Sequence, residues 1–249
     1  MSVTVEEQGA ARVVRWDHRA HRNAWDRATI EAIADAVETA TEDPAVRCLV
    51  ARGAGEDFSA GDDLFEAADS DAAGFAQTID QFQRLTRVVL HSPVPVIAAI
   101  DGVCIGGALE FAASCDLRIA TQRARFATPE VLIGLGASNA GTLLLPEVLG
   151  ESAARELLLT GALKDAAWMD RHGFFNALVP AGELDAAVAE WAAAFDATTA
   201  PAVARTKRML NERFGDLLPA AMERETLTCL ELFDTPEAQA AVRRFARRD

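Results

Sequence analysis

The sequence lacks several features that would indicate whole classes of protein. Among its 249 residues, no apolar run approaches the roughly 20 residues that a membrane-spanning helix requires. The first residues show no basic region followed by an apolar core, so we expect no signal peptide, no membrane partner and a cytoplasmic protein. The four cysteines form no CxxC pair and no metal-ligand spacing, so we expect buried, reduced thiols (Cys48, Cys104, Cys115 and Cys229).

Positive charge is also scarce. The chain has 24 Lys and Arg against 38 Asp and Glu, which gives a formal net charge of −14. Proteins that bind nucleic acids neutralise phosphates with clustered Lys and Arg, so this balance argues against a nucleic-acid partner. It does not exclude an anionic small molecule, because backbone amides and a few cations suffice to bind one.

Common catalytic and phosphate-binding motifs are missing as well. No serine lies in a G-x-S-x-G motif, there is no P-loop, and residues 102–107 do not form G-x-G-x-x-G. The four histidines have no cluster spacing. A hydrolase triad therefore has no support, and we expect neither a metal ion nor a dinucleotide cofactor.

Strand-like and helix-like segments alternate through about residue 126. Short strands are predicted at 3–5 and 13–16, and apolar runs of strand length follow at 46–51 and 94–100. Between them, apolar residues at helical spacing predict a helix after Asp26 and a long helix around 75–89. This alternation favours an α/β fold with a largely parallel sheet.

The chain becomes mainly helical after Pro129. One short strand is predicted around 175–179, and no internal repeat or flexible linker occurs. The helical faces could pack on neighbouring subunits, although solvated faces explain them equally well. The predicted helices span 153–160, 165–171, 184–195, 203–213 and 217–233.

Two glutamates follow glycine-bearing or turn-forming segments. Gly106 and Gly107 are predicted to begin a helix, where free amides and the macrodipole favour an anion, and Glu110 lies on the same face. Glu130 follows Pro129 in a second turn. Paired carboxylates beside a backbone anion site are suited to general acid/base catalysis. Alternatively, the glycines allow close packing and both glutamates are favourable N-terminal carboxylates.

A third segment, 58–64, reads Phe-Ser-Ala-Gly-Asp-Asp-Leu. Asp62 or Asp63 can cap a following helix, and Ala60 could present a second free amide. Amides from two separate loops would form an oxyanion hole for an acyl carbonyl. An ordinary capped loop is the alternative interpretation of this segment.

Together these segments resemble the enoyl-CoA hydratase/isomerase (crotonase) family. The resemblance is carried by the ordered set of motifs, which covers almost the whole chain. It extends weakly to Arg22-Asn23-Ala24, Gly141-Thr142, Gly161 and Lys207. The motifs are 58–64, 95–102 leading into Gly106-Gly107-x-x-Glu110, 114–116, and Phe126-x-x-Pro129-Glu130-x-x-x-Gly134.

The resemblance implies a crotonase-like spiral of ββα units over 1–195 and a helical C-terminal trimerisation region over 196–249. It implies a homo-trimer or dimer of trimers that acts on acyl-CoA thioesters, without a cofactor because CoA is part of the substrate. The amides of Ala60 and Gly107 would polarise the thioester carbonyl. Glu110 and Glu130 would activate water, which favours an enoyl-CoA hydratase. The implied substrate-binding residues are Arg22, Ala24, Ala60, Gly61, Asp62, Asp63, Gly106, Ser138 and Asn139.

The chain departs from the family pattern at 137–144. Where hydratases usually have Pro-Gly-x-Gly-Gly-Thr-Gln-Arg, this sequence has Ala-Ser-Asn-Ala-Gly-Thr-Leu-Leu, so Ser138 and Asn139 add bulk beside the acyl pocket. Residues 236–249 also lack the usual Glu-Gly pair. Isomerisation, dehydration of an unusual hydroxyacyl-CoA, decarboxylation and a non-catalytic acyl-CoA-binding subunit therefore remain alternatives.

Overall fold

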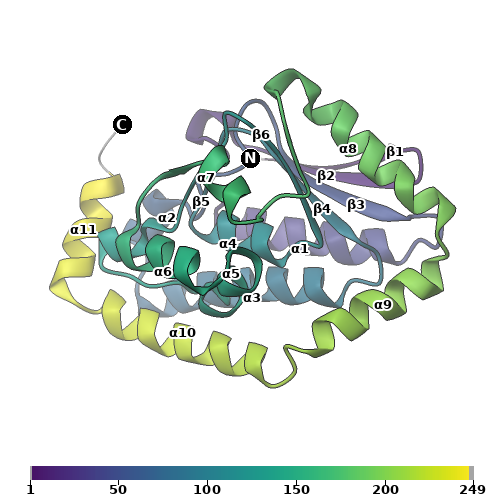
Figure 1. Ribbon diagram of the computed structural model, residues 1–249. Helices are drawn as coiled ribbons and strands as arrows, with labels where there is room; N and C mark the ends of the chain where they lie inside the picture. The colour runs from purple at the N-terminus through teal and green to yellow at the C-terminus, as the bar shows by residue number, and fades with distance from the viewer. Residues whose placement is uncertain (1, 247–249) are drawn as a thin grey trace.

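The computed structural model describes residues 2–246, which form a twisted sheet covered by helices on both faces (Figure 1). Only the first two strands run antiparallel, and every later neighbour in this sheet is parallel, as the sequence predicted. In spatial order the six strands are β1 (Ser2–Gln8), β2 (Ala11–Asp17), β3 (Cys48–Gly53), β4 (Val96–Ile100), β6 (Leu117–Thr121) and β9 (Ala177–Val179).

A smaller sheet lies beside the first and was not predicted. It consists of β5 (Val103–Ile105), β7 (Arg125–Ala127) and β8 (Lys164–Asp165), and a parallel bridge joins Ser59 to Cys104. Successive strands alternate between the sheets: β4 and β5 lead into helix α4 (Gly107–Ser114), and β6 and β7 lead into the 3-10 helix η2 (Pro129–Ile133). The chain is thus a series of ββα units whose helices begin next to the small sheet.

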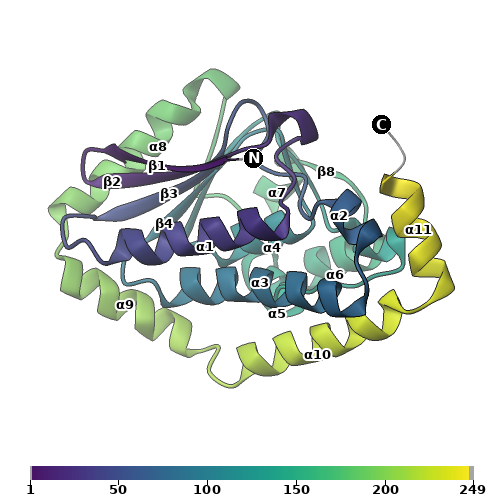
Figure 2. The ribbon, with the colours of Figure 1, turned by 180° about the vertical axis from the view of Figure 1, so that it is seen from behind.

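Helices cover both faces of the large sheet (Figure 2). The helices α1 (Arg27–Thr41) and α3 (Ala72–His91) lie on one face, and the side chains of Asp26 and Asp71 cap them. Alternation along β2 sends Val14 and Trp16 into this core and Val13 into a second one beneath α8 (Leu184–Ala193).

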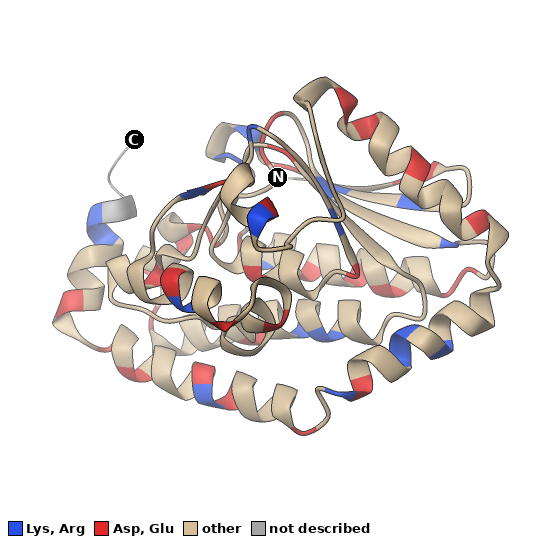
Figure 3. Cartoon of the chain, in the orientation of Figure 1, with Lys and Arg blue, Asp and Glu red and all other residues tan. Residues whose placement is uncertain are grey.

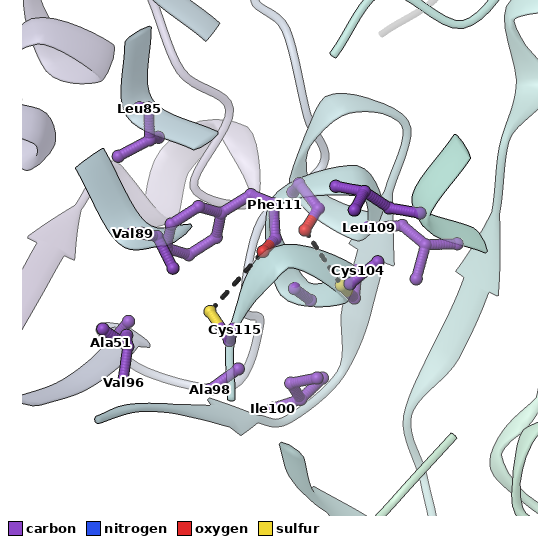
Figure 4. Close-up of a cluster of buried hydrophobic side chains, with 14 of the residues drawn as sticks. Ala51, Leu85, Val89, Val96, Ala98, Ile100, Cys104, Leu109, Phe111 and Cys115 are labelled. Carbon is purple, nitrogen blue, oxygen red and sulfur yellow. Dashed lines mark hydrogen bonds between the residues drawn. The ribbon is translucent and has the colours of Figure 1, made fainter. Parts of the chain in front are cut away.

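The helix α4 is buried along its whole length (Figure 4). Leu109 and Phe111 lie in the main core, where Cys104 and Cys115 make weak sulfur contacts to main-chain carbonyls. All four cysteines are free and buried, as the sequence predicted. A fully buried helix holds the residues of its first turn in a fixed position.

The C-terminal helices pack closely on the preceding core. Helix α10 (Leu217–Phe233) contacts α3 and α5 (Gly141–Leu149). Helix α11 (Pro236–Ala246) contacts α2 (Leu64–Asp69) and η2. A shared cluster that includes Phe75, Cys229 and Val242 joins them. The remaining helices are α5 (Gly141–Leu149), α6 (Glu151–Thr160), α7 (Ala166–Arg171), α9 (Ala200–Glu212), α10 (Leu217–Phe233) and α11 (Pro236–Ala246), with short 3-10 turns η1 (Arg19–His21), η3 (Ala181–Glu183) and η4 (Ala194–Ala197).

Acidic and basic residues are spread over the helices, although α8 carries only acidic ones (Figure 3). Within residues 2–246, no helix is long and apolar enough to cross a membrane. In the same residues, no three His, Cys, Asp or Glu side chains are grouped in a way that could hold a metal ion.

Candidate functional site

Gly106 and Gly107 begin α4, as the sequence predicted. Gly106 has a φ of +58°, and its amide donates to the carbonyl of Ala127 on β7 at 2.8 Å. A Cβ at Gly107 would lie 2.7 Å from the ring of Phe82, so only glycine fits between α4 and α3. The amide of Gly107 lies in the first helical turn, where no intrahelical acceptor is available.

The loop that contains Gly61 lies directly against this helix start. Gly61 has a φ of +87°, and a Cβ on it would lie 2.6 Å from the carbonyl oxygen of Ile105 and 3.5 Å from the nitrogen of Gly107. The two glycine-bearing segments, about 45 residues apart in sequence, therefore meet at their backbones, as an oxyanion hole requires.

The prediction that Ala60 supplies a free amide was wrong. The Ala60 N–H donates to the carbonyl of Arg22 at 3.0 Å. Asp62 forms an isolated parallel β-bridge with Trp25. The bonds of this bridge are made by the residues on either side of Asp62, so it is the Asp63 N–H that donates to the Trp25 carbonyl. Within the part of the chain that the structure describes, the amide of Asp62 has no acceptor. The free amide of this loop therefore belongs to Asp62, two residues later than predicted.

The side chains of Asp62 and Asp63 have different roles. Asp63 caps α2, and its carboxylate accepts from the amide of Phe65 at 2.9 Å. Burial, followed by the neighbouring Glu66 and Asp63 charges, raises the pKa of Asp62 to about 8. This shift favours the uncharged form of Asp62, which opposes a negative charge near its own amide less than a carboxylate would.

Glu110 lies in the first turn of α4 and is almost completely buried, with 1% of its surface exposed. Its Oε2 accepts from the amide of Asn139 at 3.1 Å, while Oε1 has no partner among the described residues. A Cβ at Gly141 would overlap Oε1, so glycine is needed there. Burial, then the nearby carboxylates of Glu225 and Glu130, raises the pKa of Glu110 well above its usual range.

Glu130 lies in η2, directly after β7, and approaches the same helix start. A Cβ on Gly106 would lie 2.7 Å from its Oε1, and its Oε2 is buried without a partner in the described part of the chain. Burial raises the pKa of Glu130 to about 7. The Glu110 and Glu130 carboxyls thus lie close enough for their charges to interact, and each has one buried oxygen without a partner among the described residues.

A third carboxylate, Glu225 on α10, was missed by the sequence analysis. It is 5% exposed and accepts from the amides of Ala140 and Thr142 at 2.6 and 2.8 Å. Burial raises its pKa, and these hydrogen bonds lower it in part. A signal was present: Glu225 falls at a core position between Met222 and Cys229 in an otherwise apolar helix stripe.

The substituted segment at Ser138 and Asn139 borders Glu110. The carbonyl of Ser138 accepts from Gln83 on α3 at 2.9 Å. Asn139 is completely buried, and its side-chain oxygen and nitrogen have no partner among the described residues. An unpaired buried carboxamide is costly, so it is available to a bound water or to a polar substrate group.

The segment at Arg22–Ala24 lies against the Gly61 loop, and its predicted contact with the substrate stays a prediction. The amide of Trp25 donates to the carbonyl of Gly61 at 2.8 Å. Asn23 is buried and donates to the carbonyls of Ala54 and Asp57, whereas Arg22 extends its guanidinium towards Asp57 at the surface. Ala24 is buried.

The raised pKa of Glu130 predicts a pH-dependent stability. The folded state holds this proton up to a pH of about 7, whereas the unfolded chain loses it near 4.5, so stability should fall as pH rises through this range. At about 1.4 kcal/mol per pKa unit, the decrease is roughly 3 kcal/mol. In Glu130→Gln, this part of the decrease in unfolding free energy between pH 5 and pH 8 should be absent, as measured by urea unfolding at both values. The exposed Glu223→Gln serves as control, and equal slopes for wild type and Glu130→Gln would refute the assignment.

Comparison with known proteins agrees with this geometry. The sequence model of the enoyl-CoA hydratase/isomerase family matches residues 6–249. A crotonyl-CoA hydratase of Syntrophomonas wolfei is 36% identical over 163 residues, which are 65% of this chain and 63% of that protein. A probable enoyl-CoA hydratase of Mycobacterium bovis is 29% identical over 217 residues, 87% of this chain and 84% of that one.

Solved structures show the same fold. An enoyl-CoA hydratase from Mycobacterium avium subsp. paratuberculosis superposes with a TM-score of 0.90 at 27% identity, covering 99% of this chain and 96% of that one. An enoyl-CoA hydratase/isomerase from Xanthobacter autotrophicus gives 0.89 at 30% identity, covering 99% and 93%. The fold is therefore the predicted crotonase fold, and the chain belongs to the enoyl-CoA hydratase/isomerase family.

Proposed function

We propose that this protein is an enoyl-CoA hydratase, which adds water to the double bond of a trans-2-enoyl-CoA thioester or catalyses the reverse dehydration. The observation that carries the proposal is that the buried carboxyls of Glu110 and Glu130 lie near the helix start, where the amides of Asp62 and Gly107 have no acceptor among the described residues. An enolate-forming addition requires this combination of a proton acceptor, a proton donor and an oxyanion site.

The two amides would stabilise the negative charge on the thioester oxygen. As hydroxide adds to Cβ, electrons move through the double bond onto this oxygen, and the N–H groups of Asp62 and Gly107 donate to it. When the enolate collapses, Cα takes up a proton. Each oxyanion donor typically contributes about 10²–10³ in rate.

The carboxyl pair would transfer the two protons. We assign Glu110 to orienting and deprotonating the water, and Glu130 to protonating Cα. Their raised pKa values arise mainly from burial, which allows a proton to reside on the pair near neutral pH. Each hydration would then restore the pair's protonation state, because one proton enters from water and one leaves to Cα.

CoA would be bound as part of the substrate, and the proposed chemistry needs neither a metal ion nor another cofactor. The segment at Arg22–Ala24, next to the Gly61 loop, would lie near the CoA nucleotide. Arg22 is the cation of this segment, and its side chain is 63% exposed, so its guanidinium would be able to reach a phosphate.

An absorbance assay of the enoyl thioester across a panel of acyl-CoA substrates tests this function. A hydratase removes the conjugated chromophore of 2-enoyl thioesters, whereas an isomerase creates it from 3-enoyl thioesters. A non-catalytic acyl-CoA-binding subunit would bind the panel without changing its absorbance, and that outcome would refute the proposal.

We expect a homo-trimer or a dimer of trimers with closed symmetry. Large apolar side chains are exposed on η2 and α6 (Leu132 and Leu159) and on α9 and α10 (Leu210 and Leu227). In the proposed assembly, some of these side chains would be buried between subunits. Sedimentation should show no stable monomer at micromolar concentration, and an active monomer would contradict this prediction.

Ser138 and Asn139 are expected to favour an acyl group with a polar or branched feature over a plain straight chain. The unpaired carboxamide of Asn139 would hydrogen-bond that group, and a substrate without such a group leaves it unsatisfied. Replacing Ser138 by Gly and Asn139 by Ala should shift kcat/KM ratios towards straight-chain substrates. Unchanged ratios across the panel would show that these side chains do not contribute to recognition.

A further inference from the structure

Helix α10 holds the turn that contacts Glu110. Glu225 on this helix accepts three hydrogen bonds from the turn: the Ala140 amide at 2.6 Å, the Thr142 amide at 2.8 Å and the Thr142 hydroxyl at 2.5 Å. The residues that directly precede Ala140 and Thr142 in the sequence, Asn139 and Gly141, contact Glu110. One turn thus connects two buried carboxylates.

The conformation of this turn is unfavourable for its sequence. Ala140 has a φ of +62° and a ψ of +22°, a left-handed conformation that alanine rarely adopts. Its carbonyl accepts from Leu143 and Leu144 and so begins α5. Among the described residues, the only acceptor for its amide is Glu225. Without that acceptor, Ala140 would lose the hydrogen bond that stabilises its left-handed conformation.

The location of Glu225 also argues against a role in packing alone. Burying a carboxylate is expensive, and an apolar residue between Met222 and Cys229 would pack at lower cost. Neighbouring groups hold other parts of the same turn: Gln83 donates to the Ser138 carbonyl, and the Cys229 thiol lies 3.3 Å from the Gly136 carbonyl. Several contacts from α10 and α3 therefore converge on this turn.

We propose that Glu225 is a positioning residue that holds Ala140 in its left-handed conformation, so that the turn presents the Asn139 amide to Glu110 and leaves space for its carboxylate at Gly141. The proposal rests on the proposed function, since Glu110 is the group that would activate water. Through this contact the C-terminal helix α10 sets the orientation of a carboxylate on α4.

Glu225 also acts on Glu110 through its charge. After burial, the Glu225 charge is the largest cause that raises the pKa of Glu110. The charges that act on this pair are Glu130 from the site and Arg224 beside Glu225 on α10. On the facing helix α3, Arg87 contacts Met222, three residues before Glu225. Removing the charge at 225 should therefore move the pH profile of hydration to lower pH.

The test compares Glu225→Gln with Glu223→Gln, an exposed glutamate on the same helix. The side-chain NH2 of glutamine would face one of the two backbone N–H groups that now donate to Glu225. Two donors cannot form a hydrogen bond with each other, so the turn should loosen. We expect faster amide hydrogen exchange over 136–142, a kcat lower by about 10- to 100-fold and a nearly unchanged KM. The pH profile should move as stated, and Glu223→Gln should match wild type in all four measurements.

A double variant separates positioning from general stability. Glycine adopts the left-handed conformation without strain, so Ala140→Gly should restore part of kcat in the Glu225→Gln background. Unchanged exchange over 136–142, or loosened exchange with an unchanged kcat, would overturn the proposal. If Glu225→Gln does not fold, Glu225→Asp is measured instead: a reduced kcat at constant KM supports the proposal, and an unchanged kcat overturns it.

Failure of the proposed function would be recognised separately. If the wild-type protein shows no hydration, the exchange measurement and an NMR titration of the 13C-labelled Glu110 carboxyl still apply. The positioning claim is retained if Glu225→Gln changes both the titration midpoint of Glu110 and the amide hydrogen exchange over 136–142. An unchanged titration midpoint would overturn it.

Discussion

Glu110→Gln and Glu130→Gln are each expected to lower kcat for hydration by about 10²–10⁴-fold, the usual contribution of general acid/base catalysis. Water must lose a proton as it attacks Cβ, and Cα must gain one. Glutamine keeps the shape of each side chain but can neither take the proton from water nor supply one to Cα. Initial rates with a trans-2-enoyl-CoA at saturating concentration measure the effect.

Binding and coupling provide the controls for this experiment. The dissociation constant for the CoA thioester should change little, because the amides of Asp62 and Gly107 remain. Groups that act on one transition state are not additive, so the double variant should fall well short of the product of the single effects. If Glu110→Gln hydrated at nearly the wild-type rate while Glu130→Gln was inactive, a one-carboxylate isomerase would replace the two-carboxylate hydratase.

Gly61→Ala is expected to lower kcat by about 10²–10³-fold, the usual cost of losing one oxyanion donor. Gly61 has a φ of +87°, and a Cβ there would lie 2.6 Å from the backbone oxygen of Ile105. Because that oxygen belongs to β5, which is held by its pairing with β7, we expect the loop to move and carry the Asp62 amide away from Gly107. The kcat of the folded variant measures this displacement.

Gly173→Ala is the matched control. Gly173 has a similar φ of +77°, but a Cβ there would meet nothing within 4 Å. Both variants incur the cost of a left-handed alanine, about 1–2 kcal/mol, whereas only Gly61→Ala disturbs the oxyanion site. Equal kcat values for the two variants would show that the Asp62 amide has no catalytic role.

The sequence predicted the larger elements because their patterns are local. The helix after Asp26 and the helix around 75–89 show apolar residues at helical spacing, and both exist as α1 and α3. The strands β5, β7 and β8 have only two or three residues each. Such short segments carry no measurable period, so only tertiary pairing reveals the second sheet.

Within the site, the choice of amide depended on a long-range contact. The segment 58–64 predicted a free N–H in the right loop, but the pairing of Ala60 with Arg22 determines which amide remains free. The role of Glu225 could not be recognised from the sequence for the same reason, since its partners Ala140 and Thr142 lie over 80 residues away in sequence. The carboxylates Glu110 and Glu130 were found because each follows a recognisable turn; their catalytic roles remain predictions.

The most direct test of the account is the mass of the product formed from a trans-2-enoyl-CoA in water labelled with oxygen-18. The proposed chemistry predicts a 3-hydroxyacyl-CoA that is heavier by one molecule of labelled water, with the label on Cβ. Wild-type protein should form it, and Glu110→Gln should form it about 10²–10⁴-fold more slowly. Recovery of only unlabelled thioester of unchanged mass, whether isomerised or intact, would contradict hydration.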